Sequence, residues 1–142
     1  GAVAIIWGRM EGPRPVRRGA GWSDCRLFYR ASADNGRTWS ADRELPGTYG
    51  WLPRTTPITL ADGRFALPIS GRTGDGGGSF LLVRSADGTE WTRGGGVIAR
   101  TSQPAVIVRD DGSLLSLMRN HPRITRSVST DHGVTWAPAE RT

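Results

Sequence analysis

The sequence predicts an all-β fold made of repeated units of four antiparallel strands, and three observations lead to this prediction. A motif of the form Ser-x-Asp-x-Gly-x-Thr-Trp recurs along the chain, and an Asp-Gly turn recurs between apolar runs. No segment of the 142 residues keeps a helical period. With 20 Gly, 9 Pro and 37% apolar residues, the composition is that of a folded protein with many turns.

The tryptophan motif occurs in full at residues 32–39 and 129–136, and in shortened form at residues 85–91. Each copy follows a short run of strand-favouring residues, at residues 27–29, 80–83 and 124–128. We expect each run to form a strand. Copies that begin at residues 32, 85 and 129 have the period of a solenoid or a propeller.

The Asp-Gly turn occurs within residues 58–67 and again within residues 106–115, with apolar residues on both sides. Asp-Gly supplies the positive φ that a tight β-hairpin needs, so we predict two hairpins. Residues 1–7 align with the strands that follow these turns, and we expect them to form a strand of the same kind.

Each repeat therefore contains two strands around the Asp-Gly turn, a third strand before the tryptophan motif and a fourth after it, which describes the blade of a β-propeller. We predict blades at residues 1–46, 47–95 and 96–142, the first lacking its innermost strand. Propellers close with about four to eight blades. Fewer than three blades indicate either a fragment or a protomer that completes its ring with copies of itself.

Charge and composition exclude several classes of function. The 19 basic residues are all Arg, and 13 acids leave a net charge of +6. These charges are spread along the chain without a long basic run, so we do not expect a nucleic-acid partner. No apolar run approaches the roughly 20 residues of a membrane span. With two His and the single Cys25, we expect neither a metal site nor a cofactor.

The aspartates of the motif, Asp34, Asp87 and Asp131, are expected to be structural. An Asp side chain accepts hydrogen bonds from the backbone of its own turn, the Gly permits a left-handed φ, and the Trp packs the turn onto the blade. The alternating strands place these motifs and the Asp-Gly turns on one rim. The opposite rim then holds residues 9–22, 49–54, 71–78, 100–103 and 119–122.

Two residues of this opposite rim lie almost symmetrically about one Asp-Gly turn. Gln103 begins the first strand of the hairpin and Arg119 ends the second. Directly opposed residues of an antiparallel pair have Cβ atoms roughly 5 Å apart. We therefore expect both side chains to contact one ligand.

The Ser-x-Asp-x-Gly-x-Thr-Trp motif resembles the Asp-box, or BNR repeat, and with the blade pattern the chain resembles the sialidase (neuraminidase) family of six-bladed propellers. The resemblance implies an exo-sialidase-like glycoside hydrolase that acts on terminal acidic sugars and is secreted or periplasmic. Asp-boxes also occur in lyases, in other glycosidases and in non-catalytic propellers, so they indicate architecture more than activity.

The resemblance also assigns roles to the two rim residues. Arg119 matches an Arg of the cluster that holds the substrate carboxylate in that family, as a guanidinium can do bidentately. Gln103 stands where the family has a Glu that helps a Tyr nucleophile lose its proton, and a neutral amide cannot be that base. The nucleophile and the acid/base residue belong to blades that this segment does not contain, so the catalytic residues stay unknown.

Other rim residues are candidate ligands by position alone. Arg54 is the equivalent of Gln103 one blade earlier. Trp22 and Trp51 either stack on a sugar or pack between blades. We interpret Asp75 as a turn residue, although it is also a candidate acid, and His121 as a weak candidate ligand.

The sequence is compatible with three functions. The first is part of a sialidase-like glycoside hydrolase that recognises a carboxylated carbohydrate such as sialic acid, the isolated chain being inactive. The second is a non-catalytic carbohydrate-binding propeller, which Gln103 favours. The third is a scaffold whose rim binds protein.

Overall fold

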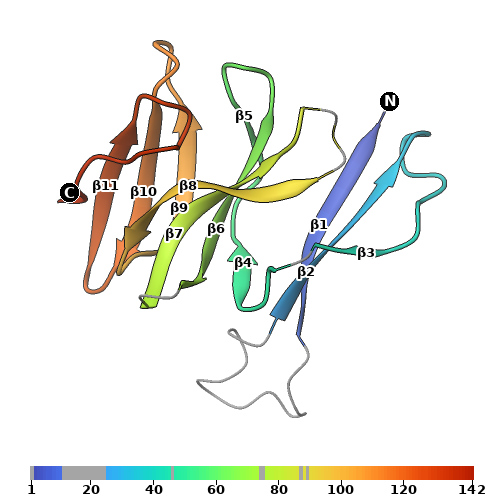
Figure 1. Cartoon of the computed structure of the whole chain (residues 1–142), viewed down its shortest axis with the longest axis horizontal. Helices are drawn as coiled ribbons and strands as arrows, with labels where there is room; N and C mark the ends of the chain where they lie inside the picture. Colours follow the sequence, from blue (N-terminus) through green and yellow to red (C-terminus); the bar gives the residue numbers. More distant parts are fainter. Residues whose placement is uncertain (1, 11–24, 46, 74–75, 87, 89) are drawn as a thin grey trace. The chain divides into compact units, whose positions relative to one another are not determined.

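A computed structural model describes residues 2–10, 25–45, 47–73, 76–86, 88 and 90–142. This part of the chain contains twelve strands and no helix, which confirms the predicted all-β class (Figure 1). The strands form three antiparallel sheets. The chain divides into two compact units, Gly1–Leu52 and Pro53–Thr142.

The first unit holds a sheet of β1 (Val3–Met10), β2 (Cys25–Ser32) and β3 (Arg43–Glu44), in that order. The strands expected at residues 1–7 and 27–29 are thus confirmed, and they pair in continuous antiparallel register. The core of this unit includes Leu27 and Leu45, both almost fully buried. The Thr48 hydroxyl accepts a hydrogen bond from the Leu27 N–H at 3.0 Å and donates one to the Leu45 carbonyl at 2.7 Å.

The first sheet of the second unit has the strand order β6-β7-β8, with β5 paired to β6, and β4 at its border crosses the division between the two units. The strands are β4 (Trp51–Pro53), β5 (Ile58–Thr59), β6 (Phe65–Thr73), β7 (Gly76–Arg84) and β8 (Trp91–Ala99). The second sheet has the order β12-β11-β10-β9. Its strands are β9 (Ser102–Val108), β10 (Leu114–Asn120), β11 (Arg123–Ser129) and β12 (Glu140–Arg141).

Both predicted Asp-Gly hairpins are present, β5 with β6 and β9 with β10. Their turns close with the same backbone bonds: Gly63 N–H to Leu60 carbonyl and Gly112 N–H to Arg109 carbonyl, each at 2.9 Å. Gly63 and Gly112 have φ angles of 82° and 79°, the left-handed values that the sequence predicted. The strand directions place these turns at one end of both sheets, together with residues 85–86, 88, 90–91 and 129–136. We call this end the turn edge.

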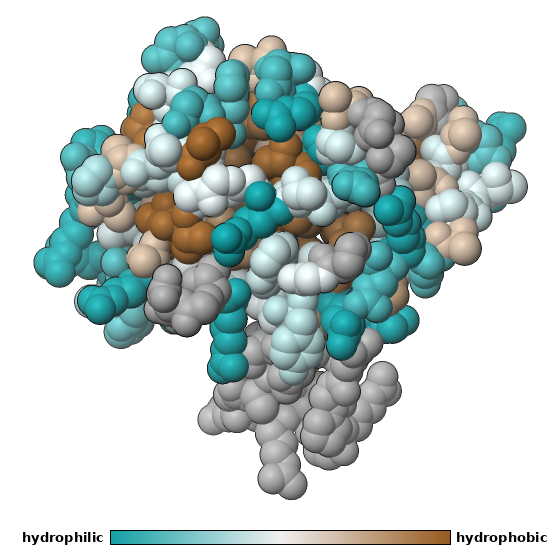
Figure 2. Space-filling view, in the orientation of Figure 1, coloured by the Kyte–Doolittle hydropathy of each residue, from teal (hydrophilic) through white to brown (hydrophobic). Residues whose placement is uncertain are grey.

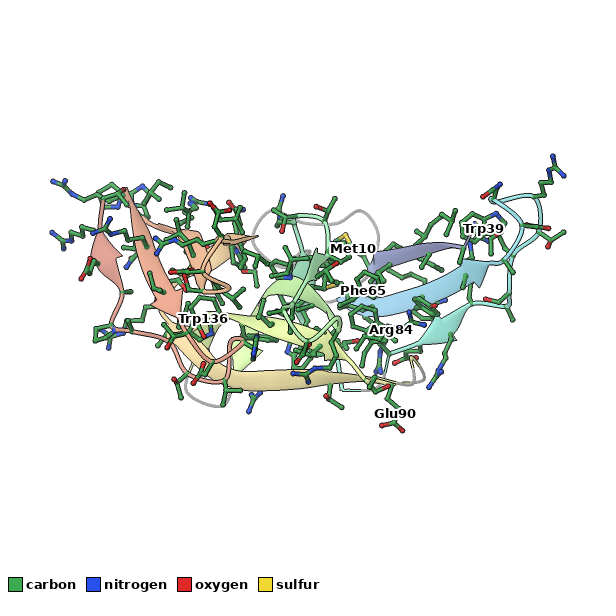
Figure 3. The ribbon with its side chains drawn as sticks, turned by 90° about the horizontal axis from the view of Figure 1, so that it is seen from above. Met10, Trp39, Phe65, Arg84, Glu90 and Trp136 are labelled. Atoms are coloured by element: carbon green, nitrogen blue, oxygen red, sulfur yellow. The ribbon has the colours of Figure 1, made fainter. Side chains whose placement is uncertain are left out.

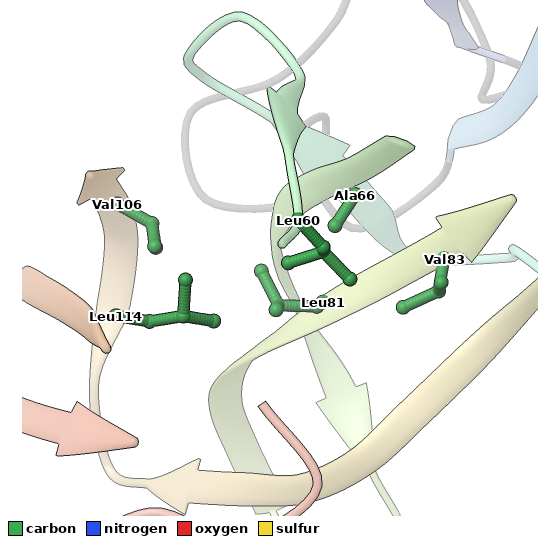
Figure 4. Close-up of a cluster of buried hydrophobic side chains, with 6 residues drawn as sticks. All are labelled: Leu60, Ala66, Leu81, Val83, Val106 and Leu114. Carbon is green, nitrogen blue, oxygen red and sulfur yellow. The ribbon is translucent and has the colours of Figure 1, made fainter. Parts of the chain in front are cut away.

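Six buried apolar side chains form a core cluster of the second unit (Figure 4). Leu60, Ala66, Leu81 and Val83 come from the first sheet and its turn, and Val106 and Leu114 come from the second. Each fully buried Leu or Val stabilises the folded state by about 1.5–3 kcal/mol. The cluster therefore fixes the two sheets face to face.

The two full tryptophan motifs form loops with the same hydrogen bonds, and we call them the aspartate loops (residues 32–39 and 129–136). In the first, Asp34 Oδ1 accepts the Thr38 N–H at 2.9 Å, and Asp34 Oδ2 accepts the Thr38 hydroxyl at 2.7 Å. The Ser32 hydroxyl donates to Asp34 Oδ1 at 2.7 Å and accepts the Gly36 N–H at 2.8 Å.

Asp131 repeats this arrangement with Thr135, Ser129 and Gly133 in the second loop. The structural role predicted for Asp34 and Asp131 is confirmed, because their carboxylate oxygens are occupied by their own loops. Asp87 lies outside the described residues. These hydrogen bonds, those from Thr38 above all, lower the Asp34 pKa to about 2, and those from Thr135 lower the Asp131 pKa to about 2.

The second aspartate loop also joins the two sheets of its unit. The Gly96 N–H of β8 donates to the Val134 carbonyl of the loop at 2.7 Å. A Cβ on Gly95 would lie 2.2 Å from that same carbonyl oxygen. Trp136 is partly buried against the core cluster, and its ring lies 3.5 Å from where a Gly96 Cβ would be (Figure 3). The glycines of β8 thus let the loop backbone approach the neighbouring sheet.

We predict that Gly95→Ala destabilises the protein by about 3 kcal/mol or more, because its methyl group would overlap the Val134 carbonyl. Gly63→Ala is the matched control: Gly63 also has a positive φ, but a Cβ there meets nothing within 4 Å. The control is expected to lose only about 1–2 kcal/mol of unfolding free energy, because its Cβ makes the left-handed conformation unfavourable. Urea unfolding followed by tryptophan fluorescence measures both losses, and equal losses would contradict the close approach at Gly95.

We also predict that acid weakens the fold through the aspartate loops. Folding lowers the pKa of Asp34 and Asp131 from 3.8 to about 2, so the folded state binds these protons less readily than the unfolded chain. The stability from these carboxylates is therefore full above about pH 5 and is lost as the pH falls from about 4 to about 2.

The double variant Asp34→Asn, Asp131→Asn is expected to be less stable at pH 7 and to show a weaker dependence on pH in this window. Urea midpoints between pH 7 and pH 2 measure both effects. A variant whose midpoint falls in parallel with that of the parent would show that other groups cause the acid sensitivity.

Candidate functional site

Arg119 lies at the exposed end of β10, on the side of the second unit opposite to the turn edge. The pairing of β9 with β10 runs regularly to Leu117 opposite Ala105, and then shifts so that Arg119 is opposite Ser102. Gln103 and Pro104 together face the single residue Met118, which is a β-bulge. Gln103 is therefore beside Arg119 but not directly across from it, in contrast to the predicted pairing.

Proline gives a physical reason for the bulge. Pro104 has no N–H to donate and its ring restricts the backbone, and within sheets proline occurs at bulges and on edge strands such as β9. Gln103 takes up the extra length with a φ of 53°, a left-handed conformation that is uncommon for a residue with a Cβ. Such strain costs about 1–2 kcal/mol and persists only where neighbouring structure holds it in place.

The neighbouring sheet holds the bulge in place. The Gln103 N–H donates to the Ser70 hydroxyl of β6 at 3.2 Å. Thr101, the residue before β9, is buried. Its hydroxyl lies 2.6 Å from the Ile98 carbonyl oxygen and 2.9 Å from the Ser79 hydroxyl. Both bonds fix the start of β9, and with it the position of Gln103.

Arg54 is exposed and follows β4 directly. The next residue, Thr55, donates from its hydroxyl to the Pro104 carbonyl at 3.4 Å. The backbone thus brings the segments that carry Arg54, Gln103 and Arg119 to one neighbourhood.

The other candidates lie elsewhere or outside the described residues. His121 is exposed in the turn between β10 and β11, and Trp51 is half-buried in β4. Trp22 and Asp75 belong to the residues that are not described. In the described ranges no group of three His, Cys, Asp or Glu side chains is arranged to hold a metal ion.

Three further arginines share this end of the sheets, and the sequence reasoning did not single them out as ligands. Arg72 is near the end of β6, Arg100 lies between β8 and β9, and Arg123 begins β11, all exposed. We call this end of the second unit the arginine edge (residues 54–57, 71–73, 76–78, 99–103 and 119–123). In the sequence, the position of these arginines next to the predicted strand ends is the feature that could have identified them.

The arginine edge is rich in positively charged side chains. Its described residues include five arginines and no Asp or Glu. A guanidinium can bind a carboxylate or a phosphate bidentately. We find no helix in the described ranges that has the length and apolar character to cross a membrane.

Comparison with known proteins identifies the family. The sequence model of the BNR repeat-like domain matches residues 16–142. No match is found among curated proteins. Among solved structures, a Hadza microbial sialidase superposes with a TM-score of 0.76 at 21% identity, over 97% of this chain and 30% of that chain.

Two further sialidases have a similar fold. Trypanosoma rangeli sialidase has a TM-score of 0.73 at 20% identity, over 96% of this chain and 26% of that one. The intramolecular trans-sialidase of Ruminococcus gnavus has a TM-score of 0.66 at 23% identity, over 83% of this chain and 26% of that one. The chain therefore spans less than a third of the length of these structures. It belongs to the family of BNR repeat-like domains and has part of a sialidase-like fold.

Proposed function

We propose that this chain is part of a sialidase-like glycoside hydrolase propeller that recognises a terminal acidic sugar through Arg119, and that the isolated chain does not hydrolyse it. One observation carries the proposal. An exposed Arg119 is the last residue but one of β10 and lies beside a strained bulge, and that bulge is fixed to the neighbouring sheet. Strain that the surroundings maintain is a feature of binding and catalytic sites.

The guanidinium of Arg119 supplies two parallel N–H donors, which match the two oxygens of a sugar carboxylate. The relative from Ruminococcus gnavus was solved with oseltamivir carboxylate bound, a ligand that carries this group. Gln103, next to Arg119, has an amide that donates and accepts hydrogen bonds and thus orients a sugar hydroxyl or carboxylate.

Gln103 also favours a second candidate function, a non-catalytic carbohydrate-binding module. An amide has no proton affinity near neutral pH, so Gln103 cannot remove a proton from a nucleophile. Saturable binding of a sialoside without release of its aglycone would support binding without catalysis, whereas turnover by the isolated chain would contradict the proposed inactivity.

We predict that Arg119→Ala lowers the affinity for N-acetylneuraminic acid by about 10- to 100-fold, because a charge-assisted bond contributes about 1.5–3 kcal/mol. Arg109→Ala, an exposed arginine at the turn edge, is the matched control and should leave the affinity unchanged. Calorimetric titration measures both. The methyl ester of the sugar, which lacks the carboxylate charge, should bind the parent as weakly as the acid binds the Arg119 variant.

An unchanged affinity in Arg119→Ala would remove this residue from the site. Equal binding of the acid and its methyl ester would show that the carboxylate is not recognised.

We further propose that copies of the chain associate through the outer face of the β9–β12 sheet. Strand register places Ile107 and Leu117 on this one face, where they are 57% and 42% exposed. Arg119 lies on the same face at its other end, opposite Ile124, and stays outside the proposed contact. Figure 2 shows hydrophobic side chains gathered over the strands of the second unit. The opposite face of the same sheet packs on another sheet of this chain, and a second copy provides a sheet of the same kind.

Light scattering of the parent is expected to give a mass above that of one chain. Leu117→Glu should shift the mass toward the monomer, because it buries a charge in the contact while disturbing little of the folded chain. A parent that is monomeric at high concentration would refute this association.

A further inference from the structure

The first aspartate loop contains the dipeptide Asn35-Gly36, which plays no part in the proposed function. Asparagine followed by glycine is chemically labile, because a residue without a Cβ lets its backbone nitrogen approach the preceding side-chain carbonyl closely. Asn35 is exposed, and its φ of 59° is the left-handed conformation that asparagine tolerates better than most residues. The loop therefore combines a reactive sequence with access to water.

Both backbone polar groups of Gly36 are held within the loop. Its N–H donates to the Ser32 hydroxyl at 2.8 Å, and its carbonyl accepts the Trp39 indole N–H at 3.0 Å. Ser32 is only 3% exposed and donates to Asp34 Oδ1 at 2.7 Å, so the group that accepts the Gly36 N–H is itself fixed. In this arrangement the Gly36 nitrogen keeps its proton in a hydrogen bond to Ser32 and cannot attack the Asn35 side chain.

The second aspartate loop has the same backbone geometry with a different residue at the labile position. His132 has a φ of 60°, and the Gly133 N–H donates to the Ser129 hydroxyl at 2.8 Å. A histidine has no side-chain amide to lose. The two loops thus share their hydrogen bonds, but the reactive group belongs to the first loop.

We propose that Asn35 is a site of spontaneous deamidation, which the hydrogen bond between Gly36 and Ser32 suppresses until the first aspartate loop opens. In the open loop the Gly36 nitrogen loses its proton to hydroxide and forms a bond to Asn35 Cγ. The bond from Cγ to the side-chain nitrogen breaks, ammonia leaves, and a five-membered succinimide remains. Water then opens this ring at one of its two carbonyls, which gives aspartate or isoaspartate.

The modification prevents the loop from closing as before. In isoaspartate the main chain runs through the former side chain, which inserts one methylene group before the Gly36 nitrogen. The Gly36 N–H then no longer meets the Ser32 hydroxyl. Aspartate keeps the main chain but adds a negative charge beside that of Asp34, and the two charges repel one another. Each opening that leads to reaction is therefore recorded permanently.

The test follows deamidation of the folded 142-residue chain in mildly alkaline buffer, by mass spectrometry of the tryptic peptide 31–37, which contains Asn35. Ser32→Ala should accelerate the mass gain about 5- to 10-fold, the factor by which loss of a hydrogen bond shifts a local opening equilibrium. Ser129→Ala is the matched control. It removes the equivalent bond to Gly133 in the second loop and should leave the rate at Asn35 unchanged.

Thr38→Val is a second variant that does not depend on Ser32→Ala folding. It removes the hydroxyl that donates to Asp34 Oδ2 at 2.7 Å without touching Gly36, and it should also accelerate the reaction. Asn35→His, which copies the second loop, should abolish the mass gain of this peptide.

The chain unfolded in guanidinium chloride gives the rate without protection, and the folded parent should react at least about tenfold more slowly. Equal rates in the folded and unfolded parent would overturn the proposal, because the loop would then give no protection. If the loop variants react no faster than the parent, the hydrogen bonds of the loop are not what suppresses the reaction, and the proposal is wrong. An unfolded chain that gains no mass in this peptide would contradict the lability of Asn35 itself.

Discussion

The contact between the second aspartate loop and strand β8 is the constraint on which the second unit depends. Two sheets that pack only through apolar side chains can slide over one another, since hydrophobic contacts have little directional preference. The bond from the Gly96 N–H to the Val134 carbonyl adds direction, and the absence of a side chain on Gly95 allows it to form. The loop can play this part because the Asp131 carboxylate fixes its shape through hydrogen bonds within the loop.

The contact between the second aspartate loop and β8 also bears on the arginine edge, at the other end of the strands. With the sheets held in one relative position, Ser70 of β6 and Ser79 of β7 lie where Gln103 and Thr101 need hydrogen-bond partners. The bulge at Gln103 and Pro104 is therefore a product of both sheets, and the strand end that carries Arg119 is positioned by residues distant in the sequence. Hydrogen bonds within the loops at one edge thus contribute to the geometry of the opposite edge.

Most of the fold could be predicted from local signals. Asp62-Gly63 and Asp111-Gly112 predicted their hairpins because the left-handed φ of a tight turn is a local requirement that glycine meets. The structural role of Asp34 and Asp131 could also be predicted from local sequence, since the hydrogen bonds that their carboxylates accept come from residues within four positions.

The site was less predictable, because its geometry depends on contacts between sheets. Symmetry about the turn placed Gln103 across from Arg119, but Pro104 interrupts the ladder, and the register of the strand end changes by one residue. Pro104 was visible in the sequence as a sign of a bulge. The partner of Gln103, Ser70, is 33 residues away, and no local pattern connects the two. The alignment of Arg72, Arg100 and Arg123 along one edge likewise becomes apparent only when the strand registers are known.

The bulge also has a consequence for solubility. Strand β9 is at the border of its sheet, where unpaired backbone groups invite strands of other molecules to add on and begin aggregation. Pro104 removes one donor from that border, and the left-handed Gln103 turns the backbone away from the extended form that an added strand would need. Only residues 105–108 keep a regular border, which is shorter than the six- or seven-residue segments typical of amyloid zippers.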